Sequence, residues 1–196
     1  MRCCLVGVFF LFASCISPLA SHETARTLGE GNQEVIGGLG VFGHVLKWNM
    51  GITEDLDVGV QWETFNLGLR AKYAFINSKQ SGFSLATALG GGNVNNGTYY
   101  YGDLMTSYLT GDWEPYGTIR ASHTTCNARQ DKSKEGKEHI GEVFKCDRRT
   151  YDRIQLTIGA KYWLNDKWFL TLEGGRVFAT REAFPTIAGM SIGRKF

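Results

Sequence analysis

The chain has 196 residues, a length that fits one domain. Its 21 basic and 19 acidic residues give a formal net charge of +2, and this near balance implies neither a nucleic-acid partner nor an acidic substrate. With 25 glycines, 3 prolines and 13% aromatic residues, the composition favours many strands joined by tight turns.

The first twenty residues have the features of an export signal. Arg2 is followed by an apolar stretch over residues 3–13 and then by small residues. About a dozen apolar residues are too few to span a bilayer as a helix, so the pattern predicts a signal peptide over residues 1–20. No later segment approaches the ~20 apolar residues of a membrane-spanning helix.

Two kinds of cleavage fit the end of this signal. The segment from Phe12 to Cys15 resembles the lipobox of bacterial lipoproteins, although that family usually has leucine in place of Phe12. This resemblance implies a lipid attached to Cys15, which adds about 0.8 kcal/mol of membrane affinity for each buried CH2. Ordinary cleavage near Ala20 or Ala25 is the alternative.

The cysteines agree with export. They are Cys3, Cys4, Cys15, Cys126 and Cys146. If the first two leave with the signal and Cys15 is acylated, Cys126 and Cys146 remain as a natural disulfide pair. Their loop of about 20 residues would contribute ~3 kcal/mol in the chain-entropy model. Two reduced thiols are the alternative, and the nearby His123 and His139 match no familiar zinc spacing, so no metal site is expected.

A polar segment over residues 26–33 is interpreted as a short linker, and alternation of apolar and polar residues follows it. Residues 150–164 give the clearest example, since Ile154, Leu156 and Ile158 alternate with polar residues and glycine. The pattern predicts ten strands, near residues 34–42, 44–52, 56–63, 65–76, 82–92, 98–110, 114–126, 150–164, 167–179 and 184–196.

An even number of strands places both termini at one side of the sheet. The short connections at 53–55, 77–81, 111–113 and 165–166 then share that side. The longest connection, 127–149, falls on the other side, as is typical of bacterial membrane barrels. Eight strands remain possible if two of the predicted strands merge.

The final strand carries a resemblance to the small outer-membrane β-barrel proteins of bacteria, over residues 34–196. It ends on Phe196, with Ile192 and Met190 on the same apolar face. The resemblance implies a closed antiparallel up-and-down transmembrane β-barrel in the outer membrane of a diderm bacterium. It also implies that the barrel-assembly machinery recognises Phe196, Ile192 and Met190. Arg194 departs from the family pattern, and near the interface its charge can reach water.

The placement of aromatic residues favours this membrane barrel over a soluble one. Aromatic side chains lie near strand ends on the apolar faces, as interfacial belts require: Trp62, Tyr73, Phe75, Tyr162, Trp168 and Phe196. A periplasmic lipocalin-like ligand-binding barrel is the alternative, and its apolar faces would point inward.

The opposite faces of the strands predict a polar lumen. It is formed by Lys47, Asp57, Glu63, Arg70, Lys72, Arg153, Lys161 and Glu173. In so small a barrel we expect these side chains to pair and fill the interior, with a narrow pore for small solutes or ions as the alternative. The inward glycines Gly51, Gly59, Gly68 and Gly159 either leave free volume or allow curvature.

The expected role is structural or interactive at the cell surface. The loop 127–149 holds seven basic residues against five acids, and contact with anionic lipopolysaccharide or another surface ligand is a functional interpretation of it. An enzyme is not expected, and neither is a cofactor. His123 and Asp103 are the candidates nearest to the outer rim, but Ser122 and His123 are adjacent in a strand and should face opposite ways.

Overall fold

The computed structural model describes residues 20–40, 43–64, 66–94, 97–126, 149–179 and 183–196. Within them the chain forms ten strands: β1 (Gln33–Gly40), β2 (Gly43–Gly51), β3 (Leu56–Glu63), β4 (Asn66–Ile76), β5 (Gly82–Val94), β6 (Gly97–Leu109), β7 (Trp113–Cys126), β8 (Arg149–Trp163), β9 (Trp168–Ala179) and β10 (Ala183–Lys195). None of the described residues belongs to a helix long and apolar enough to cross a membrane.

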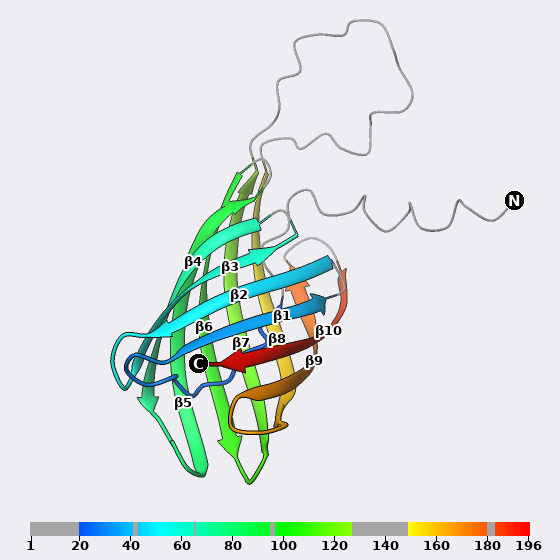
Figure 1. The fold of residues 1–196 in the computed structure, drawn as a ribbon. Helices are drawn as coiled ribbons and strands as arrows, with labels where there is room; N and C mark the ends of the chain where they lie inside the picture. Colours follow the sequence, from blue (N-terminus) through cyan, green and yellow to red (C-terminus); the bar gives the residue numbers. More distant parts are fainter. Residues whose placement is uncertain (1–19, 41–42, 65, 95–96, 127–148, 180–182) are drawn as a thin grey trace, which may run out of the picture.

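The ten strands form one closed barrel. Each strand pairs antiparallel with the next, and β1 pairs with β10, where Glu34 lies opposite Lys195. Figure 1 shows the red β10 beside the blue β1. Closure leaves no strand edge unpaired, which is the condition for a sheet inside lipid. The predicted ten-strand up-and-down barrel is confirmed, including the division of residues 34–52 into two strands, which the structure shows as β1 and β2.

The start of β1 and the end of β10 lie at one end of the barrel, which we call the inner end. The short turns 52–55, 77–81, 110–112 and 164–167 lie there too. The connection 127–148 leaves from the opposite, outer end and lies outside the described residues. The wall is uneven in height, because β1 to β3 have 8 or 9 residues whereas β7 and β8 have 14 and 15 (Figure 1).

Apolar side chains face outward along the wall. Leu69 is 69% exposed and Ile158 is 74% exposed, whereas their strand neighbours Arg70 and Thr157 are buried. The same alternation holds in every strand whose burial is described. A lipocalin-like barrel needs the reverse arrangement, with charges outside and apolar residues inside.

An aromatic belt surrounds the inner end. Its members on the outer surface are Tyr73, Phe75, Phe83, Tyr108, Trp113, Tyr162, Trp168 and Phe196. Neighbouring rings touch, since the Trp113 and Tyr162 centroids lie 4.7 Å apart and those of Tyr73 and Phe75 lie 5.4 Å apart. Of the six predicted belt residues, Trp62 alone lies at the outer end, against His44. Such belts mark the depth at which a barrel meets the membrane interface.

The inward glycines accommodate large rings. Gly159 lies opposite Tyr116, and Gly68 lies against Tyr99; a Cβ at either glycine would overlap the ring. The other two predicted positions are covered as well: Gly51 by the backbone of residue 29, and Gly59 by the amide of residue 49. These glycines therefore leave no free volume, and this alternative of the sequence analysis is wrong. Aromatic rings over sheet glycines are a known way to stabilise curved sheets.

Candidate functional site

The lumen holds the protein's own N-terminal segment. Residues 20–28, called the lumen segment below, have no strand partners and pass between the walls of the barrel. Ala20 to Ala25 are each at most 5% exposed. The segment runs toward the inner end and joins β1 through a turn at residues 29–32. Part of the stretch interpreted as a linker, residues 26–33, therefore lies inside the barrel.

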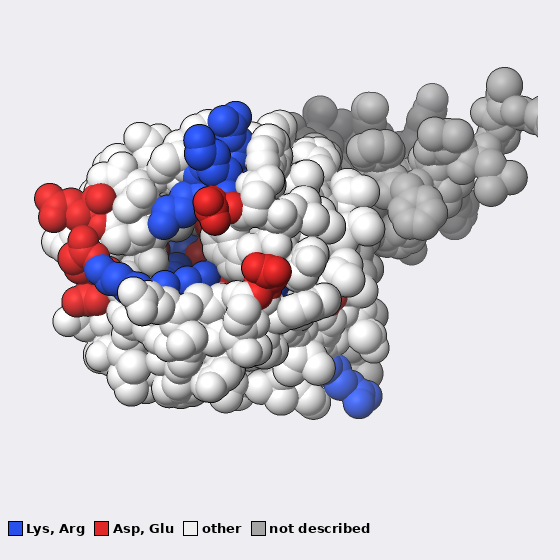
Figure 2. Space-filling model, turned by 60° about the horizontal axis from the view of Figure 1, so that its bottom comes forward, with Lys and Arg blue, Asp and Glu red and all other residues white. Residues whose placement is uncertain are grey.

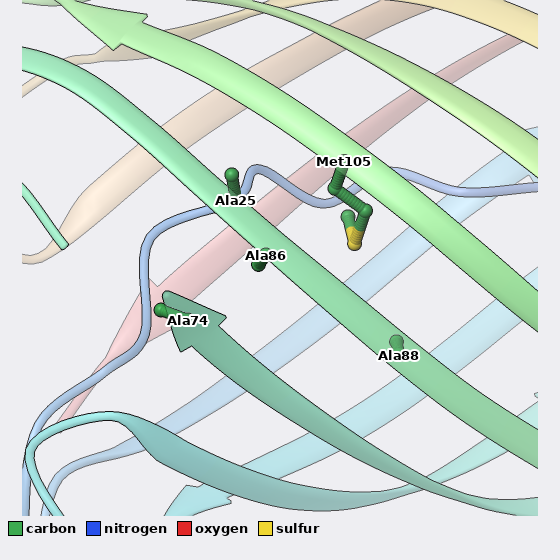
Figure 3. Packing of buried hydrophobic residues seen from close by; sticks show 5 residues of the cluster. All are labelled: Ala25, Ala74, Ala86, Ala88 and Met105. Carbon is green, nitrogen blue, oxygen red and sulfur yellow. The ribbon is translucent and has the colours of Figure 1, made fainter. Parts of the chain in front are cut away.

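Small side chains make room for this segment. Ala25 is fully buried among Ala74 of β4, Ala86 and Ala88 of β5, and Met105 of β6 (Figure 3). The three wall alanines occupy inward positions where other strands carry charged or aromatic residues. Because interiors are close-packed, these positions determine whether a backbone fits beside the wall.

Glu23 carries the only described acidic side chain of the segment, and it pairs with two wall cations. Its carboxylate contacts the Arg70 guanidinium and lies 3.3 Å from Lys47 Nζ. Lys47 also donates to the backbone carbonyl of Ser21 at 2.5 Å. All three charged side chains are nearly inaccessible to water, so each depends on the others for compensation.

Arg26 forms an ion pair with the opposite wall, and in this pair the segment supplies the cation and the wall supplies the carboxylate. Its guanidinium binds Glu114 of β7 through two hydrogen bonds of 2.9 and 2.7 Å, and Glu114 is fully buried. Ser107 donates a third bond to the same carboxylate at 3.0 Å. A bidentate arginine–carboxylate pair combines charge with fixed geometry, so it orients the segment as well as holding it.

The wall also binds the backbone of the segment. Lys72 donates to the carbonyl of Arg26 at 2.6 Å and pairs with Asp57 at 3.1 Å. Asp57 in turn accepts the N–H of Leu28 at 3.1 Å. These contacts satisfy backbone groups that would otherwise be buried without partners.

Glu173 of β9 receives three hydrogen bonds at the far end of the segment. It accepts the backbone N–H of Ser21 at 2.9 Å and that of His22 at 2.7 Å. The third donor is the hydroxyl of Tyr116, at 2.8 Å. The lumen segment is thus attached to β2, β4, β7 and β9 at once.

Other charges of the wall pair without the segment. Arg120 forms a bidentate pair with Asp103 at 2.7 and 2.8 Å, and its guanidinium lies 4.1 Å from the centre of the Tyr101 ring. Lys161 binds Glu34 at 2.9 Å. In both pairs the positive and the negative charge come from the wall, so much of the polar interior is neutralised without the segment.

All eight predicted lumen residues lie inside the barrel and are at most 9% exposed: Lys47, Asp57, Glu63, Arg70, Lys72, Arg153, Lys161 and Glu173. Glu34, Glu114 and Arg120 also lie in the lumen, and they were not among the predicted lumen residues. The alternation around Glu114 and Arg120 is less regular in the sequence. Both residues are nevertheless an even number of positions from Tyr116, and this spacing places all three on the same face of the strand.

A cavity of about 370 Å³ opens at the inner end, between the lumen segment and the wall. Its lining includes the cations of Arg26, Lys72, Lys161 and Lys195, together with Glu34. Figure 2 looks at this end and shows blue and red side chains gathered at the mouth, with largely uncharged wall around them. Water and small ions can reach this mouth, where the segment bounds the cavity.

The histidine considered for catalysis lies on the outside of the wall. His123 Nδ1 is 2.6 Å from Asp152 Oδ1, and the ring stacks on Tyr100 with centroids 4.8 Å apart. Its Nε2 lies 3.4 Å from Thr125 Oγ1. Ser122 pairs with the inward Tyr101, so the adjacent serine and histidine face opposite sides as expected. Asp103 lies inside, paired with Arg120, and not at the rim.

Arg194 lies at the inner rim between two rings of the aromatic belt. Its guanidinium is 4.6 Å from the centre of Phe196 and 5.5 Å from that of Trp168. Met190 and Ile192 face outward, 53% and 46% exposed. The arginine therefore stacks on the rings at the edge of the belt, and recognition of this strand by the assembly machinery stays a prediction.

The cysteine predictions fall largely outside the described residues. Cys126 is buried at the outer end of β7, whereas Cys15 and Cys146 belong to segments that the structure does not describe. The disulfide and the lipid attachment therefore stay predictions. Within the described ranges, no group of three or more His, Cys, Asp or Glu side chains is arranged to hold a metal ion.

Solved structures similar to this one are outer-membrane β-barrels and a designed barrel. The N-terminal barrel domain of Pseudomonas aeruginosa OprF is 14% identical, covers 86% of this chain and 99% of its own, and gives a TM-score of 0.43. KdgM porin, solved in complex with disordered oligogalacturonate, is 13% identical over 84% of this chain and 99% of its own, with a TM-score of 0.41. A de novo designed transmembrane β-barrel is 13% identical over 87% and 99%, with a TM-score of 0.33. No family model and no curated protein matches the sequence.

Proposed function

We propose that this protein is a small outer-membrane β-barrel whose lumen is closed by its own N-terminal segment, and that it acts structurally or through its outer loops. One observation carries the proposal: Glu23 and Arg26 of the lumen segment pair with Arg70, Lys47 and Glu114 on facing walls. A segment fixed by buried ion pairs on both sides blocks the path along the barrel axis.

The outer wall supports the membrane location. A band of exposed Leu, Ile, Val and Ala side chains lies above the aromatic belt, and the described charged groups on the outward face are confined to its edges and outer half. In water such a surface would aggregate, whereas in lipid it needs no further cover. The inner end, with its short turns, then faces the periplasm, and the long connection faces the outside.

The outer connection is the proposed interaction surface. Residues 127–148 contain six basic side chains: Arg129, Lys132, Lys134, Lys137, Lys145 and Arg148. In the sequence these residues connect β7 and β8, the two longest strands. We propose the anionic lipopolysaccharide headgroup as their ligand, since phosphates and lysine or arginine attract at such a surface.

The first test is heat-modifiability of the protein extracted from outer membranes, followed by single-channel conductance. We expect faster gel mobility without boiling and no steady conductance from the wild-type barrel. A variant that lacks residues 21–28 should form open channels. A protein found only in the soluble fraction, with no mobility shift, would overturn the membrane barrel.

A narrow pore is the second candidate, and the cavity at the inner end favours it. That cavity leads to a segment held by side-chain contacts and not by strand pairing. Displacement of the segment would join the cavity to the upper lumen. Conductance of the wild-type protein that disappears when the segment is cross-linked to the wall would support this candidate over the closed barrel.

A further inference from the structure

Glu173 differs in its partners from four other buried carboxylates of the lumen. Glu34, Asp57, Asp103 and Glu114 each bind a lysine or an arginine. The described partners of Glu173 are instead two backbone N–H groups and a tyrosine hydroxyl. The His22 ring lies 3.6 Å away and carries charge only when it is protonated. A buried carboxylate without a cation is costly, so the missing charge calls for an explanation.

We propose that the mature chain begins at Ser21 and that Glu173 binds its α-ammonium group. Hydrolysis of the Ala20–Ser21 peptide bond by a secretion signal peptidase consumes one water. It leaves a carboxylate on the released Ala20 and an α-amine on Ser21, and the amine takes up a proton. The nitrogen concerned is the one that lies 2.9 Å from Glu173 Oε1. Cleavage therefore creates a cation at the position where the carboxylate lacks one.

The remaining contacts agree with this boundary. Cleavage removes the bonds of Ala20 to Glu63 and Lys47, which are long at 3.4 and 3.3 Å. It keeps the 2.5 Å bond from Lys47 to the Ser21 carbonyl. Ala20 is a small residue directly before the proposed cleaved bond, as at the last position of an A-x-A-like site.

The two other boundaries fit the lumen less well. A chain that begins at Arg26 loses Glu23, which leaves Lys47 and Arg70 buried without that carboxylate. A chain that begins at a lipidated Cys15 keeps an uncharged amide at Ser21, so Glu173 keeps its present partners. Of the three boundaries compared, Ser21 alone supplies the cation and retains Glu23.

The inference rests on the proposed outer-membrane barrel, and the experiment separates the two. The protein is purified from outer membranes, its intact mass is measured, and its N-terminal tryptic peptide is sequenced. We expect a mass equal to residues 21–196 and the peptide Ser21–Arg26. A lipidated Cys15, or a chain that starts at Arg26, would overturn this inference alone. Absence of the protein from outer membranes would overturn the proposed function.

A second measurement tests the contact with Glu173 itself. The α-amine of the folded barrel is labelled with an amine-reactive reagent, and the labelled Ser21–Arg26 peptide is quantified. We expect protection in the wild-type barrel and in Glu54→Gln, which alters an exposed carboxylate at the inner end. The Glu173→Gln barrel should label faster while it still begins at Ser21, because processing precedes folding. Equal labelling of all three barrels would show that Glu173 does not hold the amine.

Discussion

Glu23 lies inside the barrel and forms an ion pair with Arg70 of the wall, although its own segment belongs to no strand. This pair, together with Lys47, connects the N-terminal segment to the sheet at mid-depth of the lumen. The pair explains why a stretch of chain with little apolar surface stays inside a barrel: it satisfies charges that the wall has already buried.

Removal of this carboxylate should weaken the whole barrel. Glu23→Ala leaves Lys47 and Arg70 without their shared anion, so we expect a loss of about 3–5 kcal/mol in the free energy of unfolding. Urea unfolding in detergent, followed by the gel-mobility shift, measures it. Glu30→Ala, an exposed carboxylate in the following turn, is the matched control and should change little. Equal midpoints for the two variants would contradict the structural role of the pair.

A larger side chain at one of the wall alanines that pack against Ala25 should expel the lumen segment. Ala86→Leu places a bulky side chain where Ala25 packs, and we expect a cost of about 1–3 kcal/mol together with new channel openings in conductance recordings. Ala121→Leu adds the same volume on the outward face of β7 and should leave the channel closed. Silent recordings from Ala86→Leu would mean that the segment is not what closes the lumen.

The ring and the hydroxyl of Tyr116 should contribute separately to the stability of the barrel. Tyr116→Phe removes the bond to Glu173 and keeps the ring over Gly159, so we expect a loss of about 1 kcal/mol. Gly159→Ala forces the ring away from the strand, and its effect should be the larger of the two. Thermal mobility-shift curves of both variants give the comparison. The reverse ranking would show that the hydroxyl contributes more than the ring packing.

A charge on the outward wall tests what surrounds the barrel. Ile158 lies in the middle of β8 with 74% of its surface exposed. In lipid, Ile158→Arg should cost about 2–4 kcal/mol, since arginine at the midplane loses its hydration. Gln80→Arg, in an inner turn, should be neutral because it meets water. Reversible folding into lipid vesicles measures both, and a neutral Ile158→Arg would indicate that the wall faces water.

The sequence predicted the barrel wall well and its contents poorly, for a physical reason. Alternation with period two is local, so the inward position of Lys47, Arg70 and Lys161 follows from their neighbours alone. The position of Glu23 and Arg26 depends on contacts with strands far along the chain, and no local pattern records them. The role of the inward glycines could not be predicted either. The ring that covers Gly68 of β4 belongs to β6, which is distant in the sequence.

The lumen segment is continuous with β1, and β1 is the strand that completes the ring by pairing with β10. A ring that has closed admits a peptide only through its mouths. The pairing of β1 with β10 and the enclosure of the lumen segment should therefore occur together, because the segment is joined directly to β1. We therefore expect a single late kinetic step in the assembly of this barrel. In that step β1 pairs with β10 while the lumen segment is already inside.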